Sequence, residues 1–266
     1  MKKPKTLIFS GYGLNSEEET RYAFELAGSD AEIVHINDLI ASPKKLDSYQ
    51  IISFPGGFSY GDDTGSGNGF ANRIRNYLWE EIKSFVQKDK LVLGICNGFQ
   101  ILTNLGLLPA LNEDYGKREV ALLQNTSARY SNRWVDIEVQ NDSPWLKKLT
   151  RLSLPIAHGE GRFFATEKVL TQLKKKNLIA FKYIPGEITT YLSLPYNPNG
   201  ALADIAGITD ESKRILGMMP HPERGMFFTQ LPHWTMLKLQ YQKDKLPLPE
   251  FAQGLQIFNN GVSYFL

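Results

Sequence analysis

The sequence predicts an α/β fold, with a mostly parallel central sheet flanked by helices and a small antiparallel element. Three observations support this class. Short apolar runs alternate with segments of helical periodicity over roughly the first 110 residues, a pattern typical of a parallel sheet covered by helices. Beyond that point the strand-like runs are shorter and follow one another with only turns between them. A hydrophobic content of 42% in 266 residues allows a sizeable core.

The elements of the first half follow from local patterns. The predicted strands are short apolar runs between turn residues, at 6–9, 32–36, 49–54 and 90–95. A helix is expected over 17–27, because Ser16 can cap its start and Gly28 can end it. A long helix is expected over 70–87, because its apolar residues recur at helical spacing.

The second half predicts shorter elements and a C-terminal extension. Strand-like segments lie at 119–124, 134–139, 152–157, 178–183 and 202–208, and we expect them to form an antiparallel element packed beside the main sheet. A strand at 216–219 should return to the core, and a helix at 232–242 should follow. We assign residues 1–243 to one domain. Residues 244–266 form an extension whose apolar residues predict docking on the domain or on a partner.

Cys96 is the single cysteine of the chain, and it lies where an apolar run meets a helix-like segment. Gly-x-Cys-x-Gly at such a junction is typical of a nucleophile elbow, because the glycines permit a tight turn and close backbone approach. The N-terminus of the following helix stabilises negative charge and lowers a thiol pKa. A lone cysteine is more often a buried core residue. We prefer the nucleophile here because of the flanking glycines and the base described next.

His221 and Glu223 lie in a Met-Pro-His-Pro-Glu-Arg segment. The prolines favour an extended chain, in which residues two apart point to the same side. Glu223 could then bind one ring nitrogen of His221 and leave the other to face a thiol. A solvated surface turn is the alternative. Together with the elbow, the segment predicts a catalytic triad of Cys96, His221 and Glu223, which meet in space and not in sequence.

A Gly-Gly turn follows the predicted strand 49–54. Acyl transfer builds negative charge on a carbonyl oxygen, and backbone N–H groups are the usual donors to it. We therefore predict an oxyanion hole made by the N–H groups of Gly57 and Asn97, one from each turn. A simple loop turn without a catalytic role is the alternative for the Gly-Gly pair.

Composition limits the function classes. A net charge of +2 predicts neither nucleic-acid nor membrane association. No Cys/His cluster has metal-ligand spacing, so no metal site is expected. One cysteine excludes an intramolecular disulfide framework and is typical of a reducing compartment. No run approaches the roughly 18 apolar residues of a membrane span, and no signal peptide is evident. We expect a cytoplasmic location.

These motifs resemble those of the class I (triad) glutamine amidotransferases, a family with a flavodoxin-like sheet. The matching motifs are Pro-Gly-Gly at 55–57, Gly-x-Cys-x-Gly-x-Gln at 94–100 and His-Pro-Glu at 221–223. Longer segments resemble one branch, the glutaminase subunits of phosphoribosylformylglycinamidine synthase. These segments are 54–62, 94–100, 157–163 and 219–224. With the first strand, the resemblance covers most of the chain.

The resemblance implies roles for further residues. Cys96 would attack the carboxamide carbon of L-glutamine, His221 would transfer protons, and water would hydrolyse the thioester after ammonia leaves. Gly57, Phe58, Asn97 and Gln100 match positions around the substrate or the oxyanion. We assign Gly56, Phe58 and Gln100 to substrate binding. His158 lies in a glycine-flanked polar turn that could line the site or the subunit interface. We assign it to substrate binding, with a plain hairpin turn as the alternative.

The resemblance also implies a partner. In this branch the ammonia reaches the synthetase subunit of phosphoribosylformylglycinamidine synthase, which uses ATP to convert formylglycinamide ribonucleotide to formylglycinamidine ribonucleotide. ATP and Mg are therefore expected on that partner. No cofactor is expected in this chain, which carries no Walker motif. A small accessory subunit is a further partner that the resemblance admits.

Two alternatives remain at this point. The first is another class I amidotransferase that delivers ammonia elsewhere; the matches at 58–62 and 157–163 argue against it. The second is a non-catalytic protein with a cysteine elbow, acting as a sensor or a binding module. The distant His-Pro-Glu segment argues against that interpretation.

Overall fold

The structure is a computed structural model, and it describes residues 3–62 and 65–266. The strands are β1 Lys5–Ser10, β2 Asp30–His35, β3 Ile51–Phe54, β4 Leu91–Ile95, β5 Val120–Leu123, β6 Ser131–Val139, β7 Arg151–His158, β8 Arg162–Ala165, β9 Ile179–Ile184, β10 Ile205–Thr209 and β11 Ile215–Met218. The helices are α1 Glu17–Leu26, α2 Ile36–Ala41, α3 Asn68–Tyr77, α4 Trp79–Val86, α5 Asn97–Leu105, α6 Glu167–Lys175, α7 Glu187–Tyr191, α8 Trp234–Lys243 and α9 Gly254–Ser263.

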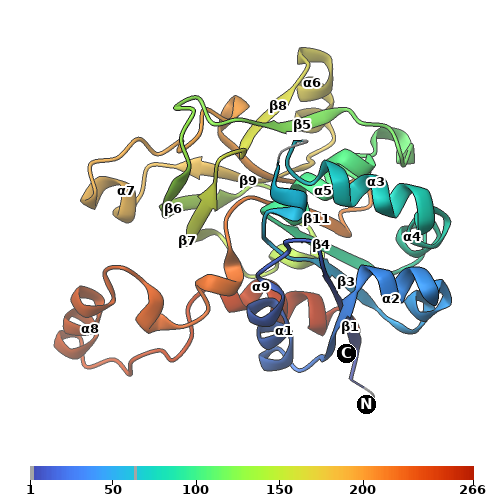
Figure 1. Cartoon of the computed structure of the whole chain (residues 1–266). Helices are drawn as coiled ribbons and strands as arrows, with labels where there is room; N and C mark the ends of the chain where they lie inside the picture. The colour runs from blue at the N-terminus through green and yellow to red at the C-terminus, as the bar shows by residue number, and fades with distance from the viewer. Residues whose placement is uncertain (1–2, 63–64) are drawn as a thin grey trace.

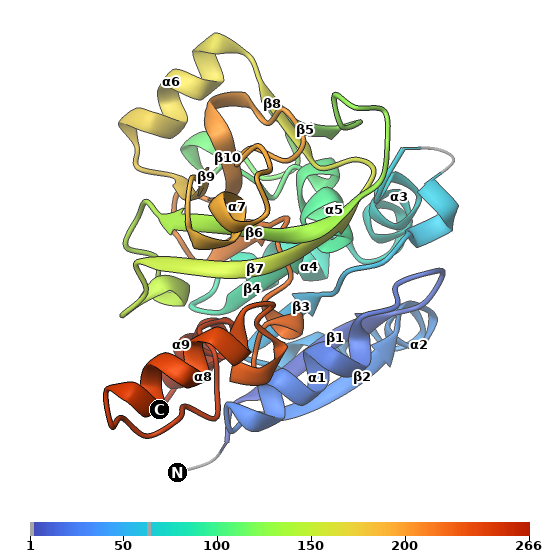
Figure 2. The same cartoon turned by 90° about the vertical axis from the view of Figure 1, so that its left-hand side faces the viewer.

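Among the described residues, nine strands form one twisted sheet in the order β2-β1-β3-β4-β11-β10-β9-β6-β7 (Figures 1 and 2). The strands from β2 to β11 pair in parallel. Helices α1 and α9 lie on one face of this parallel part, and α3, α4 and α5 lie on the other (Figure 1). The carboxyl ends of the neighbouring strands β3, β4 and β11 meet at one edge, which is where sites of parallel sheets form. The predicted α/β class is confirmed.

The predicted small antiparallel element is present, but most of the segments expected in it lie in the main sheet instead. β10, β9, β6 and β7 continue the main sheet by antiparallel pairing. In the part of the chain that the structure describes, only β5 and β8 form a separate two-stranded sheet. The physical reason is the edge of β11. The backbone groups on the open edge of β11 need partners, and β10 supplies them through the β10–β11 hairpin. Each further strand then pairs with the edge that the previous strand leaves open.

The predicted helix over 70–87 is two helices. α3 and α4 meet at Leu78, whose φ of −135° and ψ of 9° are not helical. Leu78 is fully buried, and its N–H still donates to the Ile74 carbonyl (2.8 Å). The chain therefore changes direction without losing a core side chain. No glycine or proline marks this kink, so the sequence pattern alone does not show it.

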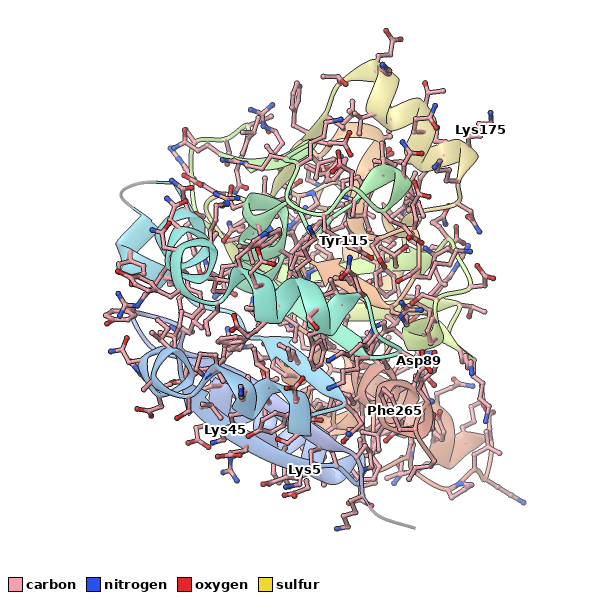
Figure 3. The ribbon with its side chains drawn as sticks, turned by 90° about the vertical axis from the view of Figure 1, so that its right-hand side faces the viewer. Lys5, Lys45, Asp89, Tyr115, Lys175 and Phe265 are labelled. Atoms are coloured by element: carbon pink, nitrogen blue, oxygen red, sulfur yellow. The ribbon has the colours of Figure 1, made fainter. Side chains whose placement is uncertain are left out.

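The C-terminal residues pack on the body of the chain. The ring of Phe258 on α9 lies edge-on to Phe24 on α1, with centroids 5.0 Å apart. Nδ2 of Asn260 donates to the Trp145 carbonyl (2.9 Å). Figure 3 shows Asp89 beside Phe265, and the hydroxyl of the neighbouring Tyr264 donates to Asp89. The division of the chain at residue 243 stays a prediction.

Helix α8 contrasts with α9. It has no buried residue and lies away from the sheet at the lower left of Figure 1.

Within residues 3–62 and 65–266, every helix is too short or too polar to cross a lipid bilayer.

Candidate active site

Cys96 sits on a strained turn between β4 and α5. Its φ of 51° and ψ of −105° are unusual for a residue with a side chain, and such strain is typical of functional positions. The flanking glycines are required by space: a Cβ at position 98 would lie 1.9 Å from the Phe54 carbonyl oxygen. A Cβ at position 94 would lie 2.5 Å from Cδ1 of Leu102. The predicted elbow is therefore present.

His221 and Glu223 pair directly. Nδ1 of His221 and Oε1 of Glu223 are 2.5 Å apart, and both side chains are buried. The chain is extended at His221, which follows β11, but Pro222–Arg224 form a 3-10 turn where the sequence predicted extended chain. The contact is made across this turn. The His221 N–H donates to the Pro155 carbonyl (2.8 Å), so β7 also helps to position the imidazole.

The ionisation of His221 depends on its two neighbours. Burial lowers the pKa of this imidazole, but Glu223 and then Cys96 raise it more strongly, to about 10. These two neighbours therefore favour the imidazolium form of His221. Nε2 of His221 is buried and has no hydrogen bond among the described residues. Since Nδ1 is held by Glu223, Nε2 is the nitrogen left for the sulfur and the substrate.

The Gly-Gly turn lies against both the triad and the loop after β1. A Cβ at Gly56 would lie 2.7 Å from Cε1 of His221, and one at Gly57 would lie 2.5 Å from the Gly13 carbonyl oxygen. Gly57 also has a φ of 154°. Oδ1 of Asn97 accepts a hydrogen bond from the Ser59 N–H (3.2 Å), which ties this turn to the start of α5. Larger residues at 56 and 57 would therefore not fit.

The predicted oxyanion donors lie at these two turns. In the described part of the chain, neither the Gly57 N–H nor the Asn97 N–H donates to a protein acceptor. Both groups are therefore free to bind an oxygen atom of a substrate, as an oxyanion hole requires. Their catalytic role stays a prediction.

Phe58 and Gln100 differ in how far they are available to a substrate. Phe58 is 39% exposed, and its ring lies 5.8 Å from that of Tyr130. The amide of Gln100 is used within the protein: Oε1 accepts from Nδ2 of Asn97 (2.8 Å), and Nε2 donates to the Glu160 carbonyl. Gln100 therefore orders Asn97. A direct contact of Gln100 with substrate stays a prediction.

His158 is the last residue of β7 and lies inside the protein. A plain hairpin turn was the alternative interpretation of this segment. The side chain is 2% exposed, and Nδ1 lies 3.2 Å from Oδ1 of Asn125. The preceding carbonyl, of Ala157, lies 3.7 Å from Sγ of Cys96. Burial, and then the charge of His221, lower the pKa of His158 to about 3. The structure thus brings a second, neutral histidine to the neighbourhood of the elbow.

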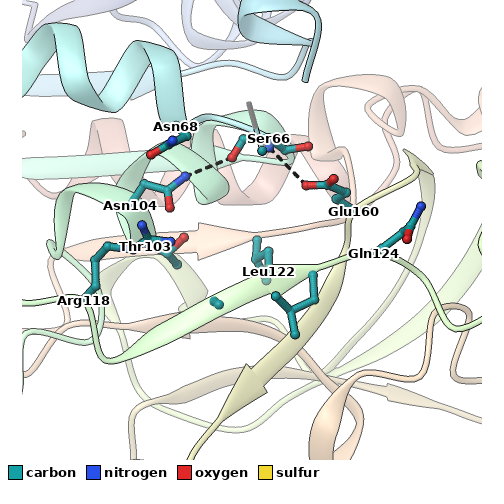
Figure 4. A pocket seen from close by; sticks show the side chains of 11 residues that line it. Ser66, Asn68, Thr103, Asn104, Arg118, Leu122, Gln124 and Glu160 are labelled. Atoms are coloured by element: carbon teal, nitrogen blue, oxygen red, sulfur yellow. Dashed lines mark hydrogen bonds between the residues drawn. The ribbon is translucent and has the colours of Figure 1, made fainter. Parts of the chain in front are cut away.

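A cavity of about 280 Å³ is lined by residues of α3, α5 and β5 together with Glu160 (Figure 4). The Ser66 N–H donates to a Glu160 carboxylate oxygen (3.0 Å), and Nδ2 of Asn104 donates to the Ser66 carbonyl (2.9 Å). The described residues that line this cavity do not include the triad. It joins the site through Glu160, whose carbonyl binds Gln100.

Three residues near the site were missed from the sequence. Arg224 directly follows the His-Pro-Glu motif and could have been found there. Its Nη2 donates to Oγ of Ser16 (2.7 Å), and its Nε lies 3.9 Å from Oε1 of Glu223. Tyr183 on β9 is fully buried; burial chiefly raises its pKa, and Cys96 adds to this. Ser16 was predicted only as a helix cap and nothing local marks Tyr183, because tertiary contacts bring both to the site.

Arg224 should assist the triad through Glu223. Arg224→Met is expected to lower kcat for glutamine hydrolysis roughly three- to tenfold, which is about 0.7–1.4 kcal/mol for one partly exposed ion pair. Arg224→Lys should recover part of the rate. The control is Arg21→Met on α1, which removes ion pairs with Glu18 and Glu25 and should leave kcat unchanged. Equal rates for the Arg224→Met and wild-type proteins would contradict this role.

Burial of neutral His158 should make stability depend on pH. The folded pKa of about 3 lies below the ordinary value of 6.5, so this contribution is complete above about pH 6.5 and is lost as the pH falls toward 3. The His158→Gln protein has no such pH-dependent loss. The difference in the free energy of unfolding in favour of the wild type should therefore shrink between pH 7 and pH 4.5. Urea unfolding of both proteins at several pH values measures this. A constant difference would contradict it.

The fold and the site together define a class: α/β proteins with a cysteine elbow at the carboxyl edge of the sheet and a His–Glu pair beside it. A family model described as "CobB/CobQ-like glutamine amidotransferase domain" matches residues 3–265, on both sides of position 243. This chain belongs to that amidotransferase family, in the branch of the PurQ subunits of phosphoribosylformylglycinamidine synthase that the following relatives define.

The relatives match along nearly the whole chain. The PurQ subunit from Methanococcus maripaludis (strain C5) is 51% identical over 266 residues, covering 98% of each chain. The PurQ subunit from Dehalococcoides mccartyi is 43% identical, covering 99% of this chain and 98% of that one. A solved structure titled "Structure of PurLQS from Thermotoga maritima" matches with a TM-score of 0.72, 29% identity and complete coverage of both chains.

Proposed function

We propose that this chain is the glutaminase subunit of phosphoribosylformylglycinamidine synthase, hydrolysing L-glutamine and supplying ammonia to a synthetase subunit for purine biosynthesis. The observation that carries the proposal is the pairing of the strained Cys96 elbow with His221–Glu223 in a chain 51% identical to a PurQ subunit. Supply of ammonia to an assembly is consistent with the Thermotoga maritima relative, whose title names PurLQS.

The proposed chemistry uses the chain's own residues. The Cys96 thiolate attacks the carboxamide carbon, and the electron pair moves to the oxygen, where the N–H groups of Gly57 and Asn97 can bind it. His221 gives its proton to the leaving nitrogen, the C–N bond breaks, and ammonia departs. His221 then takes a proton from water, whose oxygen attacks the thioester and releases glutamate and the thiolate.

The proposal extends to the partners and the compartment. The synthetase subunit is expected to hold ATP and Mg, a small accessory subunit is a further candidate, and this chain needs no cofactor of its own. We also propose that the chain works in the cytoplasm, where a free catalytic thiol stays reduced.

The test is glutamate release from glutamine, measured with and without purified synthetase subunit, ATP and formylglycinamide ribonucleotide. The expected result is strong turnover in the complete mixture. Equal turnover in all mixtures would indicate another amidotransferase branch. No turnover in any mixture would contradict a glutaminase and favour a sensor or binding protein.

A further inference from the structure

The orientation of the Asn125 amide is determined by its neighbours. Its Nδ2 lies 2.9 Å from the backbone carbonyl oxygens of Arg129 and of His158, so it donates to both. Its Oδ1 accepts from the Gly161 N–H at 3.2 Å. An amide turned the other way would place oxygen against two carbonyls and nitrogen against an N–H group. The assignment of Oδ1 is therefore unambiguous.

The tautomer of His158 follows from this assignment. Nδ1 of His158 lies 3.2 Å from Oδ1 of Asn125, which can only accept, so Nδ1 carries the proton. The imidazole is neutral, because it is deeply buried and lies near the charged His221. Nε2 therefore presents a lone pair and can only accept a hydrogen bond.

Nε2 of His158 has no partner among the described residues, and it is enclosed by protein. A buried acceptor without a donor is unfavourable, so this atom needs a donor, and the described residues supply none. Nε2 of His221, the nitrogen left for the substrate, likewise has no hydrogen-bond partner among the described residues. Gly161 holds the His158 ring in place: a Cβ there would lie 2.3 Å from Cε1.

We propose that Nε2 of His158 accepts a hydrogen bond from the carboxamide NH₂ of bound glutamine and thereby selects glutamine against glutamate. The inference rests on the proposed function. The NH₂ group is the only donor at the end of the glutamine side chain, whereas the glutamate carboxylate has only acceptors and a negative charge. An acceptor lone pair facing the carboxamide would satisfy the first and repel the second. A site built to pair with one group discriminates strongly against an analogue that lacks it.

The same contact assists turnover. After the C–N bond breaks, ammonia still carries N–H groups that Nε2 can bind, and the product glutamate has none to offer. Glutamate is therefore disfavoured where glutamine was favoured, which promotes its release.

The test compares two substitutions in the assembled enzyme with its synthetase subunit. His158→Asn places an amide nitrogen near the Nδ1 position, so it can keep the bond to Asn125 but removes the acceptor. His158→Gln reaches the Nε2 position with its carbonyl oxygen, so it can keep the acceptor. For each protein we would measure KM for glutamine and the inhibition constant of L-glutamate, with ammonium-dependent synthesis as the measure of intact assembly.

In His158→Asn, KM for glutamine is expected to rise about tenfold or more while the inhibition constant of glutamate does not rise, so discrimination falls. His158→Gln should stay within about threefold of the wild type. Gly161→Ala tests the same contact without replacing the histidine, because its Cβ would displace the His158 imidazole. This variant should also lose discrimination between glutamine and glutamate.

An unchanged ratio of the two constants in His158→Asn and Gly161→Ala would overturn the proposal. So would an equal loss in His158→Asn and His158→Gln, since the acceptor would then not be the feature that matters. A wild-type assembly with no glutamine-dependent activity would instead refute the proposed function, so the two failures are distinguishable.

Discussion

Cys96→Ala is expected to abolish glutamine-dependent synthesis in the assembled enzyme and to leave synthesis from added ammonium near the wild-type rate. Alanine cannot form the thioester, and loss of a catalytic nucleophile costs on the order of 10⁴- to 10⁶-fold. Ammonium bypasses this chemistry, because it reaches the synthetase subunit without passing through the Cys96 site. The measurement is the initial rate of product formation with each nitrogen source at the same enzyme concentration.

The substitution leaves the neighbouring groups in place. Alanine keeps a Cβ on the strained turn, and the backbone N–H of residue 96 can still donate to the Met218 carbonyl, a bond of 2.8 Å in this structure. Cys96→Ser is the size-matched companion and should also fail with glutamine, because a hydroxyl is far less acidic than a thiol. Loss of both nitrogen sources in Cys96→Ala would show that Cys96 is structural and would contradict the proposal.

Gly98→Ala is expected to have the largest effect on stability. The new Cβ would lie 1.9 Å from the carbonyl oxygen of Phe54, which belongs to a strand of the central sheet. Neither α5 nor β3 can move away without disturbing the core, so we expect a loss of about 3 kcal/mol or more. For a chain of this size the midpoint of thermal unfolding should fall by roughly 6–12 °C. Glutamine hydrolysis should fail as well, because the elbow is displaced.

Gly159→Ala is the matched control. Its Cβ would have only one neighbour within contact range, a Tyr130 ring carbon at 4.0 Å. Its backbone is outside the left-handed region, so an alanine should be tolerated there. Its unfolding midpoint should stay near that of the wild type. Equal midpoints for the Gly98→Ala and Gly159→Ala proteins would mean that the close approach of α5 to β3 is not required.

The triad brings together residues from two strand ends and a turn. Cys96 follows β4 and His221 follows β11, and these strands are neighbours in the sheet. Adjacent parallel strands place their carboxyl ends at the same edge, so about 125 residues of intervening chain do not separate the two side chains. Arg224 then ties Glu223 to Ser16 at the start of α1. The start of α1 therefore helps to position the His221–Glu223 pair, in addition to the turn at Pro222–Arg224.

Local patterns predicted those parts of the fold that depend on nearby residues. The parallel strands, α1, α8 and the elbow all have periodicity or turn residues that indicate them within a short window. The predicted strand 32–36 lies at β2, Asp30–His35, and the predicted helix 232–242 lies at α8, Trp234–Lys243. β8 and α6 were not predicted, and the kink at Leu78 carries no breaker residue.

The sequence by itself determined the chemistry-bearing residues: Cys96 between its glycines, His221 beside Glu223, and the Gly56-Gly57 turn. Each can be recognised from a few consecutive residues, because the turn or extended segment that it requires depends on neighbours in the sequence. Only the tertiary structure decided that the antiparallel strands extend the main sheet, and that Asn125 sets the tautomer of His158. These contacts join residues far apart in the chain, and they form because edge strands and buried polar atoms must find partners.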